Sequence, residues 1–169
     1  MKAALITISL ILLVSFKAHE DFLILKTDKK GEYGYVNSKG NVIIPLGKYP
    51  MCFTDTFKNF AIVLKSGSGF VVIDRAENVK YNVYTFDNGP DYISEGLFRI
   101  EENGKIGYAA SDFSVKIKPQ YGCAFPFKNG IAKVSYDCKT ETDPQTHEYH
   151  TWISKGWFYI NKQGHRVKN

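Results

Sequence analysis

The residues best suited to chemistry gather in one segment, residues 137–155. They are Asp137, Cys138, Glu141, Asp143, His147, Glu148 and His150. His147 and His150 are three residues apart, which places them on one face of a helix but on opposite faces of a strand. The neighbouring Tyr149, Thr151, Trp152 and Ile153 favour a strand. We therefore expect an exposed hairpin that turns at Asp143-Pro144, with no bound metal and no cofactor.

Other groupings of reactive residues lack the remaining parts of a catalytic site. Cys138 paired with His147 or His150 would need a third orienting residue and an oxyanion loop, and neither is evident. Asp87 and Asp91 would suit glycoside hydrolysis only across a cleft, and the segment between them has the composition of a surface turn. We therefore predict that the protein is not an enzyme.

The same segment is a candidate for partner recognition. Insertions in repeat proteins map to exposed loops, and large aromatic side chains are common anchors at protein interfaces. The candidate partner-binding residues are Tyr149, Trp152, Trp157, His147 and His150.

The elements that must position this segment form an internal repeat. Four segments align without gaps, and their first residues are 37, 36 and 51 positions apart: Tyr33–Asn37, Phe70–Asp74, Ile106–Ala110 and Trp157–Asn161. An apolar segment precedes each: Phe22–Lys26, Phe60–Lys65, Leu97–Glu101 and Ile131–Tyr136. A turn and a short third segment follow each: Asn41–Pro45, Asn78–Asn82, Ser114–Lys118 and a truncated His165–Lys168. The unit is thus strand, turn, strand, turn, strand, and the insertion at 137–155 accounts for the longest spacing.

One three-stranded meander cannot bury its own face, whereas stacked copies share a continuous core. We predict an all-β domain of about four units, near residues 22–59, 60–96, 97–130 and 131–169. The units either run as an open stack or close into a propeller-like or barrel-like array. Tyr35, Val72, Tyr108 and Tyr159 recur once per unit, so we expect them to pack between units rather than to line a ligand groove. The connections carry aromatics, such as Phe57 and Phe127, that we expect to be buried at corners.

These residues resemble the bacterial WG-repeat family. The resemblance is carried by Pro119-Gln120-Tyr121, by Asn129-Gly130-Ile131-Ala132 and by Asn103-Gly104-Lys105-Ile106-Gly107-Tyr108, and it covers nearly everything after residue 21. Trp stands at the signature position only at Trp157, where Phe158 replaces the glycine, so these are diverged copies. The resemblance implies a β-rich repeat array of the kind found in bacterial surface and envelope proteins, with no catalytic residues to transfer.

Length and charge exclude several classes of protein. A chain of 169 residues has room for one compact domain. The formal net charge is +5, but the lysines are scattered and Arg occurs only at positions 75, 99 and 166, so nucleic-acid binding is not expected.

The N-terminus has the profile of a signal peptide. The apolar run Ala3–Phe16 follows Lys2 and is 14 residues long, short of the roughly 20 needed to span a membrane. We predict a signal peptide at residues 1–18, a repeat domain at 19–169, an extracytoplasmic location and no stable membrane span after processing. The three cysteines, Cys52, Cys123 and Cys138, leave at least one thiol unpaired.

The sequence therefore favours an exported, non-catalytic β-repeat module that binds a protein or an envelope component. A structural or accessory envelope protein is the first alternative, and an envelope hydrolase or metal-dependent enzyme that uses residues 137–155 is the second. The identity of the partner and the oligomeric state stay open.

Overall fold

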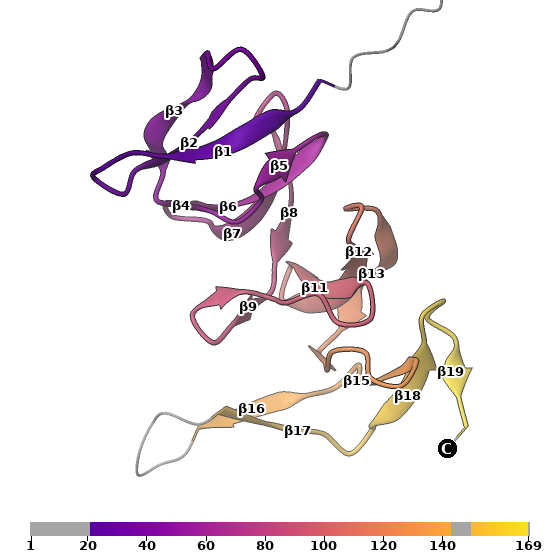
Figure 1. Ribbon diagram of the computed structural model, residues 1–169. Helices are drawn as coiled ribbons and strands as arrows, with labels where there is room; N and C mark the ends of the chain where they lie inside the picture. Colours follow the sequence, from indigo (N-terminus) through magenta and orange to yellow (C-terminus); the bar gives the residue numbers. More distant parts are fainter. Residues whose placement is uncertain (1–20, 143–149, 169) are drawn as a thin grey trace, which may run out of the picture.

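The computed structural model describes residues 21–142 and 150–168, and over these residues the chain is all-β. The predicted signal peptide, together with His147 and Tyr149, lies outside the described residues. Four three-stranded antiparallel meanders follow one another along an elongated, open array, with the first and last units at opposite ends (Figure 1). The predicted fold class is confirmed, and the described sheets form an open stack rather than a closed barrel.

Each unit contributes three strands in chain order. The first strands are β1 (Leu23–Thr27), β6 (Phe60–Lys65), β11 (Leu97–Glu102) and β15 (Ile131–Ser135). The second strands are β2 (Tyr33–Val36), β7 (Gly69–Asp74), β12 (Lys105–Ala110) and β18 (Phe158–Asn161). The third strands are β3 (Val42–Tyr49), β8 (Val79–Val83), β13 (Val115–Tyr121) and β19 (Arg166–Val167). The turns between second and third strands share a device: the side chains of Asn37, Asp74 and Asn161 each accept backbone N–H bonds from two and four residues ahead.

The chain leaves each third strand and pairs at once with the first strand of the next unit. β4 (Met51–Cys52) pairs with β6, β8 itself pairs with β11, and β14 (Cys123–Ala124) pairs with β15. β5 (Thr56–Phe57) turns back to pair with β1. These pairings divide the units among three main sheets, of four, seven and four strands, and the chain itself links each sheet to the next.

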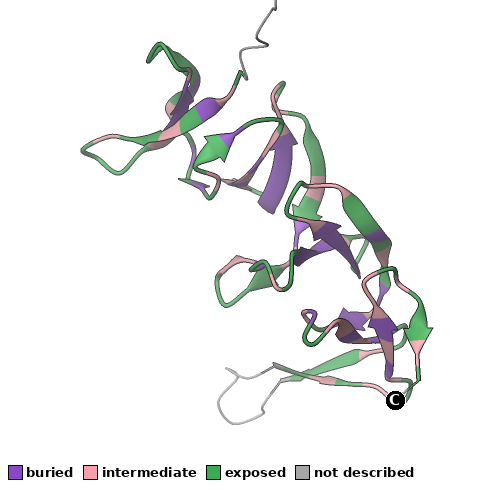
Figure 2. Ribbon diagram, turned by 45° about the vertical axis from the view of Figure 1, so that its right-hand side comes forward, coloured by how far each residue is buried: buried purple, intermediate pink, exposed green. Residues whose placement is uncertain are grey.

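The hydrophobic core is divided in the same way. One cluster joins units one and two through Tyr35 and Val63, a second joins units two and three through Val72 and Phe98, and a third joins units three and four through Tyr108. Buried positions follow the strands along the whole array (Figure 2). No unit has a core of its own, which is the arrangement that the repeat predicts.

The connections contain the expected corner aromatics. Phe57 is fully buried and Phe127 is 1% exposed, and each ring lies edge-on to a core tyrosine, Tyr35 and Tyr108 respectively. The connection between units two and three differs, because the hairpin of β9 (Thr85–Phe86) and β10 (Gly89–Pro90) is inserted there.

Our placement of Asp91 in a surface turn is wrong. Asp87 and Asn88 do form the turn, with positive φ values of 47° and 63°. Asp91, however, is 5% exposed, and its carboxylate accepts hydrogen bonds from Arg99, itself 2% exposed. Of residues 87–91, only Asp87 and Asn88 form the turn.

Glycine is required for steric reasons at one position of the second strand, Gly34 in unit one and Gly107 in unit three. In units one and three the third strand bulges opposite Gly34 and Gly107. A Cβ on Gly34 would lie 2.7 Å from the Ile44 carbonyl oxygen and 2.9 Å from the Leu46 nitrogen, and one on Gly107 would clash with the Ile117 carbonyl oxygen. In unit two, Val71 takes this place and pairs directly with Asn82, without a bulge at that position.

We expect Gly34→Ala and Gly107→Ala each to lower the free energy of unfolding by about 1–3 kcal/mol, because the backbone of the third strand must move. Urea denaturation measures the loss. Gly156→Ala is the matched control, since its new methyl would meet only Ser135 and Ser154 at 3.9 Å. An equal loss in the control would show that the third strand is not the cause.

Candidate functional site

The side chains of each unit that point toward the following unit form its forward face. In unit three this face consists of Leu97, Arg99, Ile106 and Tyr108, and all four are buried. Strand register assigns Ile131, Lys133, Trp157 and Tyr159 to the same positions in unit four, because Arg99 pairs with Tyr108 as Lys133 pairs with Tyr159. We call these four residues the end face.

Exposure of the Tyr159 position separates the end face from its counterparts in all three preceding units. Tyr35, Val72 and Tyr108 are 0%, 0% and 1% exposed, so our expectation that these positions pack between units is correct for three of the four. Tyr159 is only partly buried, as are the other three residues of the end face. Among the described residues, nothing covers this face as a following unit would.

A groove of about 430 Å³ opens beside the end face. Its walls are mainly apolar and come from the connections before and after unit three and from unit four. The lining residues that matter below are Tyr92, Phe125, Ile131, Lys128, Lys133 and Tyr159.

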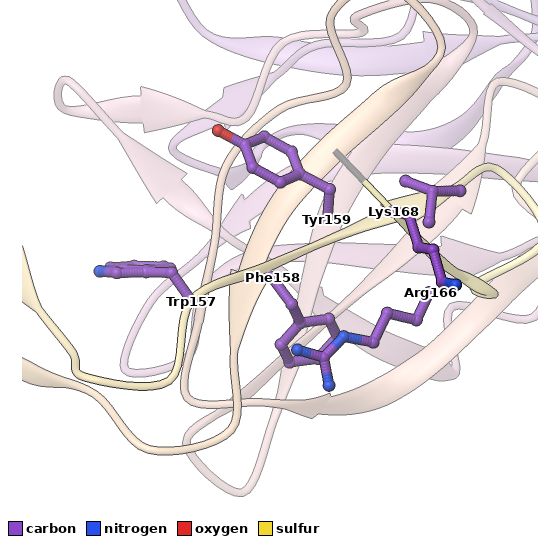
Figure 3. A pocket seen from close by; sticks show the side chains of 6 residues that line it. Trp157, Phe158, Tyr159, Arg166 and Lys168 are labelled. Carbon is purple, nitrogen blue, oxygen red and sulfur yellow. The ribbon is translucent and has the colours of Figure 1, made fainter.

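A second hollow lies across β18 and β19 (Figure 3). Trp157, Tyr159 and Arg166 line it, and the Arg166 guanidinium lies 4.7 Å from the centre of the Phe158 ring. Tyr159 points away from Phe158, as residues adjacent in a strand must (Figure 3). Tyr159 therefore borders both hollows.

Aromatic rings continue from the end face onto the connection. Phe125 contacts Trp157 and Trp152, with ring centres 5.6 and 5.3 Å apart, and Trp152 contacts Tyr84 at 6.0 Å. The Lys133 ammonium lies 4.7 Å from the centre of the Trp157 ring. Phe125 remains 40% exposed, so this aromatic row is open to solvent along part of its length.

The inserted segment forms an antiparallel hairpin, β16 (Lys139–Thr142) and β17 (His150–Ile153), whose base folds back onto the array (Figure 1). A disulfide joins Cys123 of β14 to Cys138 at the base of the hairpin. Ser135 and Ser154 share a 2.7 Å hydrogen bond across the same base. Trp152 is thereby held against the core cluster of units three and four.

The predicted partner-binding residues thus have different outcomes. Trp152 and Trp157 both contact Phe125 and belong to one surface. His150 is the first residue of β17, opposite Thr142, while His147 and Tyr149 lie outside the described residues. No pattern in the sequence selects Phe125 or Lys133, because their importance depends on which unit lacks a neighbour.

Arg99 occupies a buried polar site behind this surface. Its Nη2 donates to Asp91 Oδ1 at 2.5 Å, its Nε donates to Asp91 Oδ2 at 3.0 Å, and its Nη1 donates to the Ala124 carbonyl at 3.1 Å. The guanidinium stacks over Tyr84, 4.4 Å from the ring centre. Burial raises the pKa of the Tyr84 hydroxyl, and the nearby Arg99 charge partly opposes that rise.

The thiols offer no paired nucleophile at the hairpin. Cys138 is in the disulfide, so the Cys138–histidine pair weighed from the sequence is excluded. Cys52 is the free thiol, and burial raises its pKa to about 11 despite the Tyr35 hydroxyl that opposes the rise. Over residues 21–142 and 150–168, no three His, Cys, Asp or Glu side chains are grouped as metal ligands. The same residues contain no helix able to cross a membrane.

Comparison with protein families gives one match. The family described as WG containing repeat matches residues 33–67 and 106–137, that is, from the second strand of units one and three through the first strand of the unit that follows. The chain contains WG repeats at these two segments. Comparisons with curated proteins and with solved structures find no match.

We expect the Cys123→Ala, Cys138→Ala variant of this protein to lose about 3 kcal/mol of unfolding free energy, the value for a closed loop of this length. In a Trp157→Phe background, Trp152 emission should also shift to longer wavelength as the hairpin loosens. Cys52→Ala should leave that emission unchanged. Unaltered Trp152 emission in the double variant would show that the hairpin is held without the disulfide.

Proposed function

We propose that this protein is an exported, non-catalytic module that binds a protein partner in the bacterial cell envelope or exterior. The supporting observation is the end face: Trp157, Tyr159, Ile131 and Lys133 are only partly buried, at positions that every preceding unit packs against its neighbour. Large aromatic side chains on a rigid sheet lose little entropy on binding, which makes them effective anchors. Phe125 and Trp152 extend the surface beyond the sheet.

Two features support export. Residues 1–18 have the charge and apolar pattern of a signal peptide. The disulfide between Cys123 and Cys138 is of the kind that persists in oxidising compartments and is rare in the cytosol.

A structural or accessory envelope protein is the second candidate function. The three main sheets follow one another from β1 to β19, which makes the array a natural spacer, and a spacer would not depend on the aromatic side chains of one face. A substitution on the end face should therefore weaken partner binding if the protein is a binding module and have no effect if it is a spacer.

We expect Trp157→Ser and Tyr159→Ser each to reduce the partner protein recovered from envelope extracts by roughly tenfold, as loss of an aromatic anchor does. Both side chains are partly exposed, so the fold should survive, and circular dichroism checks this. Ile43→Ser, which changes an exposed side chain of β3 in the first unit, is the control. Equal recovery with all three variants would favour the spacer.

Export has a separate test. A chain carrying residues 1–18 should appear in the extracytoplasmic fraction without this segment and with Cys123 and Cys138 oxidised. A chain that lacks residues 2–18 should stay in the cytoplasm with both thiols reduced. Alkylation of free thiols followed by mass spectrometry measures both outcomes. A full-length chain retained in the cytoplasm would contradict the proposal.

A further inference from the structure

The end face carries a cation at a position where the preceding unit also carries one. Lys133 and Arg99 are equivalent by register, and their carbonyls accept equivalent backbone bonds, from Phe125 N at 2.9 Å and from Tyr84 N at 3.1 Å. Arg99 shows how this position is occupied when a following unit covers it.

Covering Arg99 requires a carboxylate. Asp91 binds the guanidinium through both oxygens, and a third bond runs to the Ala124 carbonyl. Without such a partner a buried cation would be strongly destabilising, because its lost hydration would go uncompensated. A surface that covers Lys133 faces the same requirement.

Among the described residues, no carboxylate forms an ion pair with Lys133 or with Lys128, the other lysine of the groove. The carboxylate of Glu95, which contacts the connection before unit four, is bound to Lys162 at 3.2 Å and to the Gly130 N–H at 3.0 Å. The two groove lysines therefore present positive charge around an apolar hollow.

Resting on the proposed function, we propose that the end face binds an acidic, extended protein segment. An acidic side chain of the partner pairs with Lys133, as Asp91 does with Arg99, and an adjacent apolar side chain enters the groove between Tyr92, Phe125 and Tyr159. The apolar walls select a peptide over an acidic polysaccharide, whose hydroxyls would lose hydration there without partners.

A second copy of the chain is a poor occupant. The backward face of the first unit, at the opposite end of the array, consists of Ile24, Lys26, Gly34 and Val36, of which Ile24 and Lys26 are exposed. Lys26 stands at the position that Val134 occupies in unit four, by the register with Gly34 and Phe158. Head-to-tail stacking would bury Lys26 and Lys133 at one interface, which like charge opposes.

The test uses the purified protein and three synthetic peptides, with affinity measured by calorimetry. The first peptide alternates Glu with Leu and Phe, the second replaces Glu by Lys, and the third replaces Leu and Phe by Ser. The first should bind, and Lys133→Glu should weaken it at least about tenfold while gaining affinity for the second. Lys39→Glu, in a turn of the first unit, is the control and should change neither.

Three outcomes would overturn the inference. Equal binding of the acidic and basic peptides would show that charge does not select the ligand. Binding of the third peptide as tight as that of the first would show that the groove does not take an apolar side chain. Self-association of the protein that Lys133→Glu strengthens would assign the face to a second copy. Failure of the proposed function gives a different result: recovery of envelope proteins would then be the same with and without the Trp157 and Tyr159 substitutions.

Discussion

The structure depends on one constraint: the first strand of a unit must find its outer neighbour in the preceding unit. β4, β8 and β14 meet this need for units two, three and four, and the side chains that this pairing brings together close each core cluster. The hydrogen bonds and the buried apolar surface therefore arise from the same contact. A unit separated from its neighbours would lose both at once, which is why a chain of such small sheets is stable only as an array.

This constraint explains the difference between inner and outer units. Strands of the middle units face a neighbour on both sides, so β7 and β12 read as nearly continuous buried runs rather than alternating ones. The outer units cover one side only. On their free sides the sequence places Lys26 at one end and Lys133 at the other, where the inner units place apolar residues or a neutralised arginine.

Much of this architecture is readable in the sequence because it is periodic. The aligned segments and the turns recur once per unit, Phe57 and Phe127 occupy corresponding corners, and each repeats a local physical requirement. The pairing of Asp91 with Arg99 occurs in one unit only, so no repeated pattern predicts it. The residues around Asp91 have the composition of a surface turn, although its carboxylate is buried. The end face could not be predicted for another reason. Tyr159 and Tyr108 occupy the same position of the repeat, and only the arrangement of the units shows that Tyr108 is buried while Tyr159 is partly exposed.

The departures from the WG pattern are equally informative. Glycine is retained at Gly34 and Gly107, where the third strand bulges close to the backbone of the second. Val71 replaces it where β8 pairs with β7 without a bulge at that position, and Phe158 replaces it where β19 pairs only with the residues after it. The Phe158 ring then contacts Tyr136 and carries Arg166 on its face. The glycine is thus required by the path of the third strand, and a bulky residue at this position marks a unit whose third strand takes another path.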